Sequence, residues 1–464
     1  MEVKDMEING ECSKPKKSKC CSEHMLHNSQ WTNLPSVVLY QIFDLLSHED
    51  RKNASLVCRH WRNNSFHSKW WPSMKFKIHS GELHKLDFIT YTFGKIVSQA
   101  TISLDSQSSS CIYELIILLR LLSENNHLKS FLLEPSHCRI ECLAVKQKDQ
   151  RLLDEILDLI IAILPRLDEF SLGCVEDLAE YKDYILRQLN PNRVKLLGLA
   201  SIKNDSLKYE QCCLNPDLMA SFKNLKVLSI DYDHLSDSLL NKLDGSEKLE
   251  RLVVHLHKIS KNQEGTTNGA WRYFKEVHPN CLLRLTLIHA HNAIEKLPVD
   301  VLREEMPLSH IKVLFCENVN MEVLHSLSQY YKGTLRSVIW IDSLSEKPSS
   351  WKFSKDASPD PFVLMAWLCS HFEELILYGY KYSGENLVAI GRLRGSEMKK
   401  LEIPEADILY NQVVDNVYLI KDITKNLRRS WSPLCNYELH PVIHNPVTGD
   451  SDEFLLPLVL QDLH

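Results

Sequence analysis

Glycine is scarce in this sequence, with 14 residues in 464, and no stretch forms a glycine-rich phosphate-binding loop. The HExxH helix of zinc proteases and the G-x-S-x-G turn of α/β hydrolases are also absent. These patterns carry the chemistry of large classes of enzymes. We therefore expect a protein without catalytic activity of its own.

Long apolar runs and clustered positive charge are missing as well. The longest apolar stretches, residues 112–122 and 156–164, are shorter than the roughly 20 residues that a helix needs to cross a bilayer. The net charge is −6, from 60 acidic and 54 basic residues spread along the chain, whereas a nucleic-acid-binding protein has a clustered basic face. We expect neither a membrane nor a nucleic acid as a partner.

The 14 cysteines are too sparse for a disulfide framework, and no apolar signal segment stands at the N-terminus. The predicted location is therefore a reducing compartment, the cytoplasm, the nucleus or both. His137-Cys138 and Cys212-Cys213 lack partners at the spacing of metal ligands. We expect no metal ion and no cofactor.

Residues 1–29 lack apolar periodicity and are predicted to be a disordered leader. A cluster of four lysines in this segment leaves open the alternative that it carries a nuclear-import signal.

Residues 30–76 contain short amphipathic helices. Pro35 stands near the start of the first helix, where its missing N–H costs nothing. The polar residues 47–50 end this helix; a second helix follows to Trp61, and a third is expected near residues 66–71. Helices this short are marginal alone, so they need one another and a partner. Apolar residues recur at spacings of three and four in the first helix, at Val38, Leu39, Ile42, Phe43 and Leu46.

These residues resemble the F-box family, in which Leu-Pro precedes an LxxIFxxL helix, an acidic turn and an SLVCRxWR segment. Arg51 departs from the pattern, because many members have Leu there, and this variant is similar to F-box only proteins of the 33 and 39 type. The resemblance implies a three-helix module that binds the Skp-family adaptor and, through it, the cullin and RING subunits of a ubiquitin ligase. The matching positions are Leu34-Pro35, Leu39, Ile42-Phe43, Leu46, Asp50, residues 55–59, Trp61-Arg62 and Trp70 or Trp71.

Ten residues are the expected contacts to the adaptor. Leu34, Pro35 and Ile42 are the strongest candidates for the partner's side, whereas others of the set also face inward among the helices. The whole set is Leu34, Pro35, Val38, Leu39, Ile42, Phe43, Leu46, Val57, Cys58 and Trp61.

From residue 81 to residue 431, a degenerate L-x-x-L-x-L motif recurs at intervals of roughly 24 to 39 residues. A stretch with helical periodicity precedes most copies. This alternation predicts parallel strands on one side and helices on the other. The fold class is therefore α/β, a small all-α module followed by an irregular leucine-rich-repeat-like α/β solenoid. The motifs begin at Leu128, Leu167, Val194, Leu225, Leu249, Leu282, Ile311, Leu335, Phe372 and Met398.

Side chains alternate along a strand, so the residues between the apolar positions of each motif face the concave side of the sheet. In the central and late motifs they form an apolar band, which is typical of an interaction site. The alternative is that the chain's own tail covers this band. The expected substrate-binding residues are Arg251, Val253, Arg284, Ile288, Phe315, Ile339, Ile376 and Tyr378.

Residues 432–464 break the repeat with four prolines and carry an apolar patch at residues 454–460. We expect a cap packed on the end of the solenoid. The alternative is a tail folded across the concave face, where it would regulate access.

These features predict the substrate-recognition subunit of an SCF-type (Skp–cullin–F-box) E3 ubiquitin ligase, with an unknown substrate protein bound to the solenoid. One alternative is an interaction scaffold that pairs with the adaptor outside any ligase. A weaker alternative is an enzyme whose site is built across the repeats.

Overall fold

The chain divides into two compact units, Met1–Trp70 and Trp71–His464. The computed structural model describes residues 30–140, 150–212, 214–246, 248–260, 263, 265–344, 359–411, 415–445 and 451–464. The expected leader, residues 1–29, lies outside the described residues. Within the described residues, no helix is long and apolar enough to cross a membrane.

Within residues 30–70, the described part of the first unit, there are three short α-helices, α1 (Ser36–Leu45), α2 (His48–Ser55) and α3 (Arg59–Ser65). The second helix expected from the sequence is in fact two, because Cys58 has an extended backbone and caps α3, its sulfur accepting the Trp61 N–H at 3.5 Å. The prediction of a third helix near residues 66–71 is wrong, because residues 68–70 form a turn and the others belong to no helix or strand. The apolar spacing continues across the break and therefore did not reveal it.

Polar side chains define the boundary between α1 and α2. The Ser47 hydroxyl accepts the Asp50 N–H at 3.1 Å and so caps the start of α2. Arg51, the departure from the F-box pattern, donates from Nε to the Phe43 carbonyl at 3.1 Å and from Nη2 to the Leu46 carbonyl at 2.8 Å. Arg51 thus satisfies the Leu46 carbonyl and gives a second donor to the Phe43 carbonyl, which also accepts the Leu46 N–H at 3.3 Å.

Aromatic rings fill the interior of the first unit. Phe43 is fully buried, and its ring packs edge-on against Trp61 and Trp70 at centroid distances of 5.8 and 5.3 Å. The indole N–H of Trp70 donates to Asp44 Oδ1 at 3.0 Å. These contacts give the short helices the tertiary support that they lack alone.

The second unit is built on a twelve-stranded parallel sheet whose strands follow one another in sequence order. A separate pair, β12 (Tyr382–Ser383) and β14 (Ile408–Leu409), lies outside it. The strands of the large sheet are β1 (Ser73–Ile78), β2 (Gln99–Leu104), β3 (Ser130–Pro135), β4 (Glu169–Ser171), β5 (Leu196–Gly198), β6 (Val227–Asp231), β7 (Arg251–Leu256), β8 (Leu282–Ile288), β9 (Leu308–Leu314), β10 (Ser337–Ile341), β11 (Glu374–Tyr378) and β13 (Lys400–Glu402).

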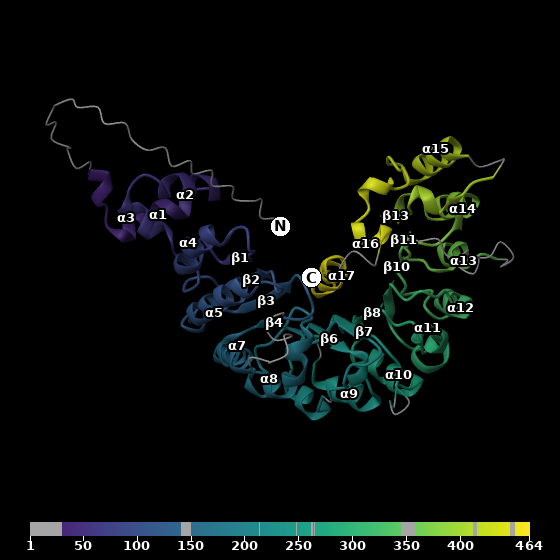
Figure 1. Cartoon of the computed structure of the whole chain (residues 1–464), viewed down its shortest axis with the longest axis horizontal. Coiled ribbons are helices and arrows are strands. Elements are labelled where there is room, and N and C mark those ends of the chain that lie inside the picture. Colours follow the sequence, from purple (N-terminus) through teal and green to yellow (C-terminus); the bar gives the residue numbers. More distant parts are fainter. Residues whose placement is uncertain are drawn as a thin grey trace. The chain divides into compact units, whose positions relative to one another are not determined.

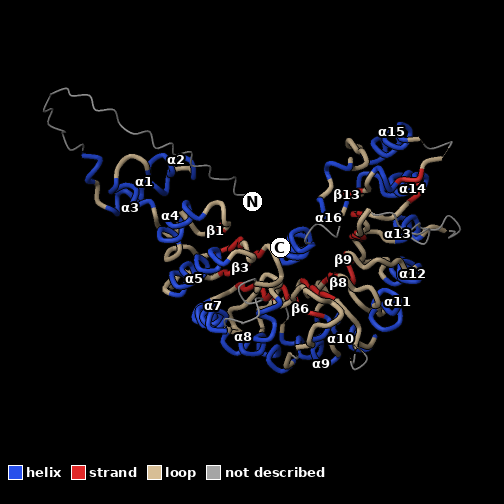
Figure 2. Tube along the Cα trace, viewed as in Figure 1, coloured by secondary structure: helices blue, strands red, loops and turns tan. Residues whose placement is uncertain are grey.

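Helices connect successive strands, because parallel neighbours require a crossover. Within this unit, the strands line the inner side of an arc and the connecting helices its outer side (Figures 1 and 2). The helices that connect strands of the large sheet are α4 (Leu83–Phe93), α5 (Ser109–Ser123), α7 (Gln150–Ile163), α8 (Lys182–Gln188), α9 (Asp237–Lys242), α10 (Asn268–Val277), α11 (Ala293–Lys296), α12 (Met321–Tyr330), α13 (Pro361–Leu368) and α14 (Gly384–Arg394). After the last strand come α15 (Asn416–Leu427), α16 (Pro441–His444) and α17 (Ser451–Leu460).

The expected fold class is confirmed, since a helical module precedes an α/β region with a long parallel sheet. The sheet begins at β1, before residue 81, where the repeat region was expected to start. Its second strand, β2, was not predicted from the sequence either. There the buried positions Val97, Ala100 and Ile102 have the motif's spacing, but alanine stands where leucine is usual.

The motif assigned to Ile311 was out of phase. In the sheet, Ile311 pairs with Leu285 and Val338, so the motif begins at Leu308. A one-residue irregularity between β8 and β9 shifts the register here. Because side chains alternate along a strand, this shift turns Lys312 rather than Val313 toward the inner face.

A charged cluster is buried inside the second unit. Lys182 Nζ lies 2.7 Å from Asp231 Oδ2, and Lys203 Nζ lies 3.6 Å from the same oxygen. Burial alone would raise the pKa of the Asp231 carboxyl, but the two lysines lower it well below its usual range. The Ser201 N–H also donates to this carboxylate, at 2.7 Å, so Asp231 ties β6 to the preceding turn.

We predict that Asp231→Asn lowers the free energy of unfolding by about 3–5 kcal/mol, because two lysines would remain buried without a counter-charge. Urea titration followed by circular dichroism measures the change. The control is Asp217→Asn, which removes an exposed ion pair with Lys242 and should leave the unfolding midpoint nearly unchanged. Equal effects of the two substitutions would contradict this account.

Candidate protein-interaction sites

The surface of the first unit carries an unusual share of apolar side chains. Six large apolar residues within 31–57 are exposed, and Leu45 is the most exposed of them at 88%. Burying one exposed Leu or Val side chain against a partner surface would stabilise the complex by roughly 1.5–3 kcal/mol. The six are Trp31, Val37, Val38, Leu45, Leu56 and Val57.

The expected adaptor contacts fall into three groups in the structure. Pro35, Val38 and Val57 are exposed, and Leu34, Ile42, Leu46, Cys58 and Trp61 are half-buried. Leu39 and Phe43 are fully buried in the module, so they hold its interior and present no surface to a partner.

Trp31, Val37, Leu45 and Leu56 were not among the expected adaptor contacts, because they lie outside the helical face that has regular apolar spacing. An apolar residue away from the periodic face of a short helix was the signal that could have identified them.

Two hydrogen bonds fix the segment that leads into α1. The indole N–H of Trp61 donates to the Trp31 carbonyl at 2.7 Å, and His60 Nε2 lies 2.8 Å from the Leu34 carbonyl. Both donors come from α3. They hold the backbone of residues 31–34 while Leu34 and Pro35 remain accessible at the surface.

We predict that Trp70→Ala destabilises the first unit by about 3–5 kcal/mol, because only 6% of Trp70 is exposed to solvent. Hydrogen exchange of the α1 amides reports the loss. Leu45→Ala is the control, since this side chain is already in solvent and its loss should leave the exchange rates unchanged. Unaltered exchange in Trp70→Ala would refute the assignment of Trp70 to the core.

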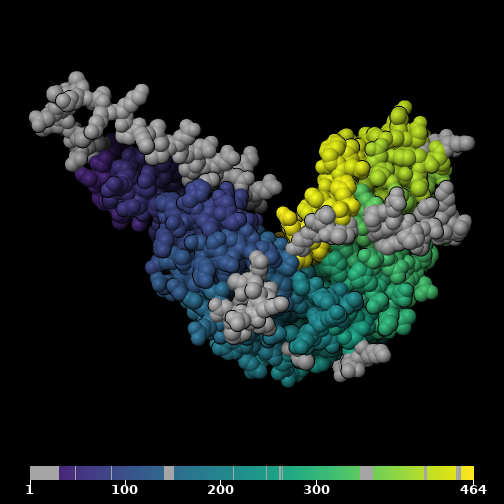
Figure 3. Space-filling model, in the orientation of Figure 1, coloured from purple at the N-terminus to yellow at the C-terminus, as the bar shows by residue number. Residues whose placement is uncertain are grey.

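The inner face of the second unit is occupied by the end of the chain. Helix α17 lies on the strand side of the arc, and Figure 3 shows the yellow atoms of this tail in the hollow of the unit. Its side chains Leu455, Leu456 and Val459 are buried. They join one apolar cluster with residues of the inner face, namely Ile288, Phe315, Ile339, Ile341, Ile376 and Tyr378.

Three cations of the inner face meet one aspartate of the tail. Arg284 Nη1 donates to Asp462 Oδ1 and Lys312 Nζ to Asp462 Oδ2, both at 2.8 Å. Arg251 Nη1 donates to the main-chain carbonyl of Asp462 at 2.9 Å. Burial alone would raise the pKa of the Asp462 carboxyl, but Lys312 and Arg284 hold it below its ordinary value.

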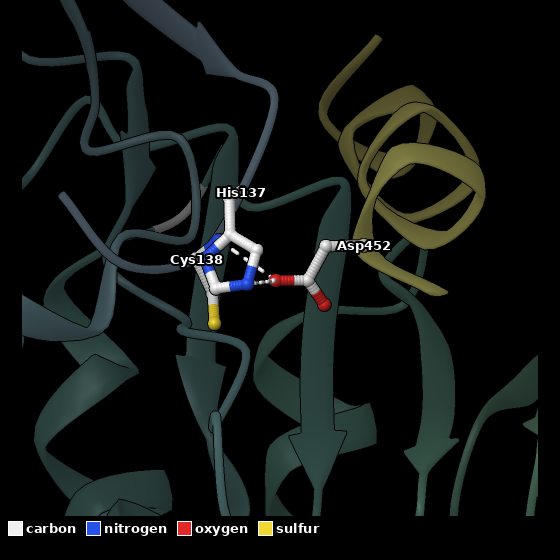
Figure 4. A group of neighbouring side chains, drawn as sticks. All are labelled: His137, Cys138 and Asp452. Atoms are coloured by element: carbon white, nitrogen blue, oxygen red, sulfur yellow. Dashed lines mark hydrogen bonds and ion pairs between the residues drawn. The ribbon is translucent and has the colours of Figure 1, made fainter. Parts of the chain in front are cut away.

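A second aspartate anchors the other end of α17. The Cys138 N–H donates to Asp452 Oδ2 at 2.8 Å, and His137 Nε2 lies 3.5 Å from the same oxygen (Figure 4). Potential ligand atoms of these three residues lie within 4.8 Å of one another. Their chemistry suits zinc, yet a structural zinc site has four ligands. The hydrogen bond from Cys138 and the contact with His137 account for Asp452 as an anchor of the tail.

The structure therefore places the expected substrate-binding residues beneath or beside the tail. Val253, Ile288, Phe315, Ile339, Ile376 and Tyr378 are buried, and Arg251 and Arg284 bind Asp462. Residues 451–464 thus lie across the inner face. That they regulate access to it, as the alternative hypothesis adds, stays a prediction. A cap at the end of the sheet is formed by earlier residues, where Leu434 pairs with Pro404.

We predict a pH dependence of tail docking. Because the pKa of Asp462 is lowered in the docked tail, its carboxylate stabilises docking at neutral pH, and this contribution is lost as the pH falls from about 4 through the lowered pKa. Protection factors of the amides in residues 451–464 should decrease over this range. The decrease should be smaller in Asp462→Asn, and identical profiles would contradict the role of this carboxylate.

Comparison with known proteins identifies the class of the first unit. Residues 31–77 match the family model described as F-box-like. The chain thus carries an F-box-like module, and the resemblance expected from the sequence is confirmed.

The similarity extends well beyond this module. F-box only protein 33 of Homo sapiens is 22% identical over 484 aligned residues, which cover 89% of this chain and 85% of that protein. F-box only protein 33 of Mus musculus is 23% identical over 478 residues, covering 89% of this chain and 84% of that protein. The chain is homologous to F-box only protein 33 over most of its length.

Proposed function

We propose that this protein is the substrate-recognition subunit of an SCF-type E3 ubiquitin ligase. In this proposal the first unit binds the Skp-family adaptor and the second unit binds a substrate protein. The chain carries out no chemistry itself, because the cullin-bound RING subunit and its ubiquitin-charged partner perform the transfer. The family match at residues 31–77 and the similarity to an F-box only protein support this assignment.

The observation that carries the proposal is the exposed apolar surface of the F-box-like module. Pro35 is exposed and Leu34 is half-buried, on a backbone held by His60 and Trp61. A partner that covers such side chains gains apolar burial without reorganising the module. This arrangement suits a docking surface better than a catalytic site.

The double substitution Leu34→Ala/Pro35→Ala tests the docking step. We expect at least a 30-fold loss of affinity for purified Skp-family adaptor, because the few dominant contacts near the centre of an interface cost about 2 kcal/mol or more when truncated. Isothermal titration calorimetry measures the affinity of each variant for the adaptor. The matched control is Val417→Ala, which removes an exposed apolar side chain from α15 in the second unit and should leave adaptor affinity unchanged.

Retained adaptor affinity in the double variant, with the α1 amides still protected from exchange, would overturn the docking assignment. Recovery of cullin together with the adaptor distinguishes a ligase subunit from a scaffold that pairs with the adaptor alone. A complex without cullin would favour the scaffold.

A further inference from the structure

A pocket of about 330 Å³ lies beyond the carboxyl ends of strands β3, β4 and β5, among the turns that follow these strands. Its lining comes from Arg139 after β3, from residues 176–181 after β4 and from residues 203–212 after β5. We call this site the rim pocket; none of the described residues that line it belongs to the tail. In open parallel α/β sheets, ligands commonly bind outside the carboxyl ends of the strands. The volume is at the lower end for ligand pockets, which suits one residue or one small molecule.

The buried end of the rim pocket holds a cation that has no hydrogen-bond acceptor. The Lys203 side chain is only 3% exposed, and its Nζ lies 3.6 Å from Asp231 Oδ2 and 4.8 Å from the centre of the Tyr209 ring. Within the described part of the chain, this ammonium group donates no hydrogen bond. Lys182 Nζ already donates to the same Asp231 oxygen at 2.7 Å. A buried ammonium group without acceptors is unfavourable, so an anion that reaches this end would be stabilised by a charge-assisted hydrogen bond.

The charges at this end call for a single negative charge. Lys182 and Lys203 bring two positive charges against the one on Asp231. Another acid near this cluster, Asp233, accepts the Gln211 amide at 3.0 Å, and burial raises the pKa of its carboxyl above the ordinary value, which favours the neutral form. A carboxylate brings one charge and two acceptor oxygens to the donors of an ammonium group. The buried end therefore suits a carboxylate.

The mouth of the rim pocket has the opposite charge. Glu180 and Glu210 line the pocket, both are exposed, and neither pairs with a cation among the described residues. Arg139 pairs with the remaining acids of the lining, the closer of them, Asp177, at 2.9 Å. Lys208 is an exposed cation of the same lining, so the acids at the mouth remain in excess. A ligand with a positive group at this end would be attracted.

Cys212 lies on the wall between the two ends. Burial raises the pKa of its thiol, Lys203 and Lys182 oppose this rise, and Glu180 adds to it. The thiol is therefore close to the cations of one end and to an acid of the other. Both ends belong to one small cavity, and a ligand that carries a carboxylate and a cation can occupy them together.

We propose that the rim pocket binds the carboxyl-terminal residue of a partner protein, a lysine or an arginine. The terminal carboxylate would bind Lys203 at the buried end, and the basic side chain would lie toward Glu180 and Glu210 at the mouth. A chain end fits a pocket of this size because only one strand of chain enters it, whereas an internal aspartate or glutamate brings chain on both sides. The inference rests on the proposed function, since it specifies a class of substrate segment that the second unit takes.

The test uses the full chain and short fluorescein-labelled glycine–serine peptides that end in lysine. One peptide has a free terminal carboxylate, and the second has an amide in its place. Binding to the wild-type chain, to Lys203→Met and to Lys226→Met is measured by fluorescence anisotropy. Lys203→Met leaves Asp231 paired with Lys182, and Lys226 is exposed, so its substitution is a control with an identical change of charge.

We expect the carboxylate peptide to bind the wild-type chain and Lys226→Met at least tenfold more tightly than Lys203→Met, because a hydrogen bond to a charged group commonly contributes this much. The amide peptide should bind all three chains with the weaker affinity. Glu180→Gln/Glu210→Gln should remove the preference for a terminal lysine over a terminal alanine. Absence of binding, or equal affinity of the carboxylate and amide peptides, overturns the inference.

A second measurement needs no substitution. Modification of Cys212 by iodoacetamide, followed by mass spectrometry, should slow several-fold at saturating carboxylate peptide. Cys435 is half-buried like Cys212 and is the control, since its modification should proceed at an unchanged rate. If Lys203→Met alters the thermal unfolding of the chain, this measurement decides, and unchanged modification of Cys212 overturns the inference.

Free lysine distinguishes an amino-acid ligand from a chain end. Its α-ammonium group would lie near the Lys203 ammonium group, so free lysine should displace the labelled peptide less effectively than the same peptide without label. Equal or better displacement by free lysine overturns the assignment to a chain end.

Adaptor affinity is measured in parallel to separate the two proposals. Absence of peptide binding with intact adaptor affinity refutes this inference alone. Retained adaptor affinity in Leu34→Ala/Pro35→Ala refutes the proposed function, and the peptide affinity of the rim pocket would be unaffected.

Discussion

A parallel sheet with helices on only one side leaves its other face to be covered, and this constraint governs the second unit. The crossover helices that the structure describes cover the outer face of the sheet. Ile288, Ile339 and Ile376 face inward, where water contact would be unfavourable. The tail removes them from water with Leu455 and Leu456. The position of the chain's end is thus a consequence of how the sheet is connected.

The same reasoning explains which parts of the fold could be predicted. The L-x-x-L-x-L motifs identified the strands from β3 onward, because a repeating unit buries its apolar residues in a repeating way. β1 and β2 were not predicted, because their apolar positions hold smaller or more varied side chains. Because the motif at Ile311 was assigned out of phase, Lys312 was not predicted to face the inner side of the sheet. One extra residue in β9 exchanges the two faces of a strand.

The candidate sites were predictable to a smaller extent. Spacing shows which residues share a helical face, but it does not show whether that face meets the core or a partner. Leu39 and Ile42 belong to one periodic set, yet the first is buried and the second is half-buried and accessible. The contact between Asp462 and Arg284 joins residues 178 positions apart, so no local pattern could have revealed it. Arg51 is the converse case, because its departure from the F-box pattern is explained by two carbonyls of α1.

The central claim is that residues 31–57 form a docking surface for the Skp-family adaptor. Hydrogen–deuterium exchange of the full chain with and without purified adaptor tests it most directly. The account predicts that adaptor slows exchange in α1, α2 and the segment between α2 and α3, and leaves the strands β3 to β11 unchanged. Unchanged exchange throughout residues 31–57 at saturating adaptor would contradict it.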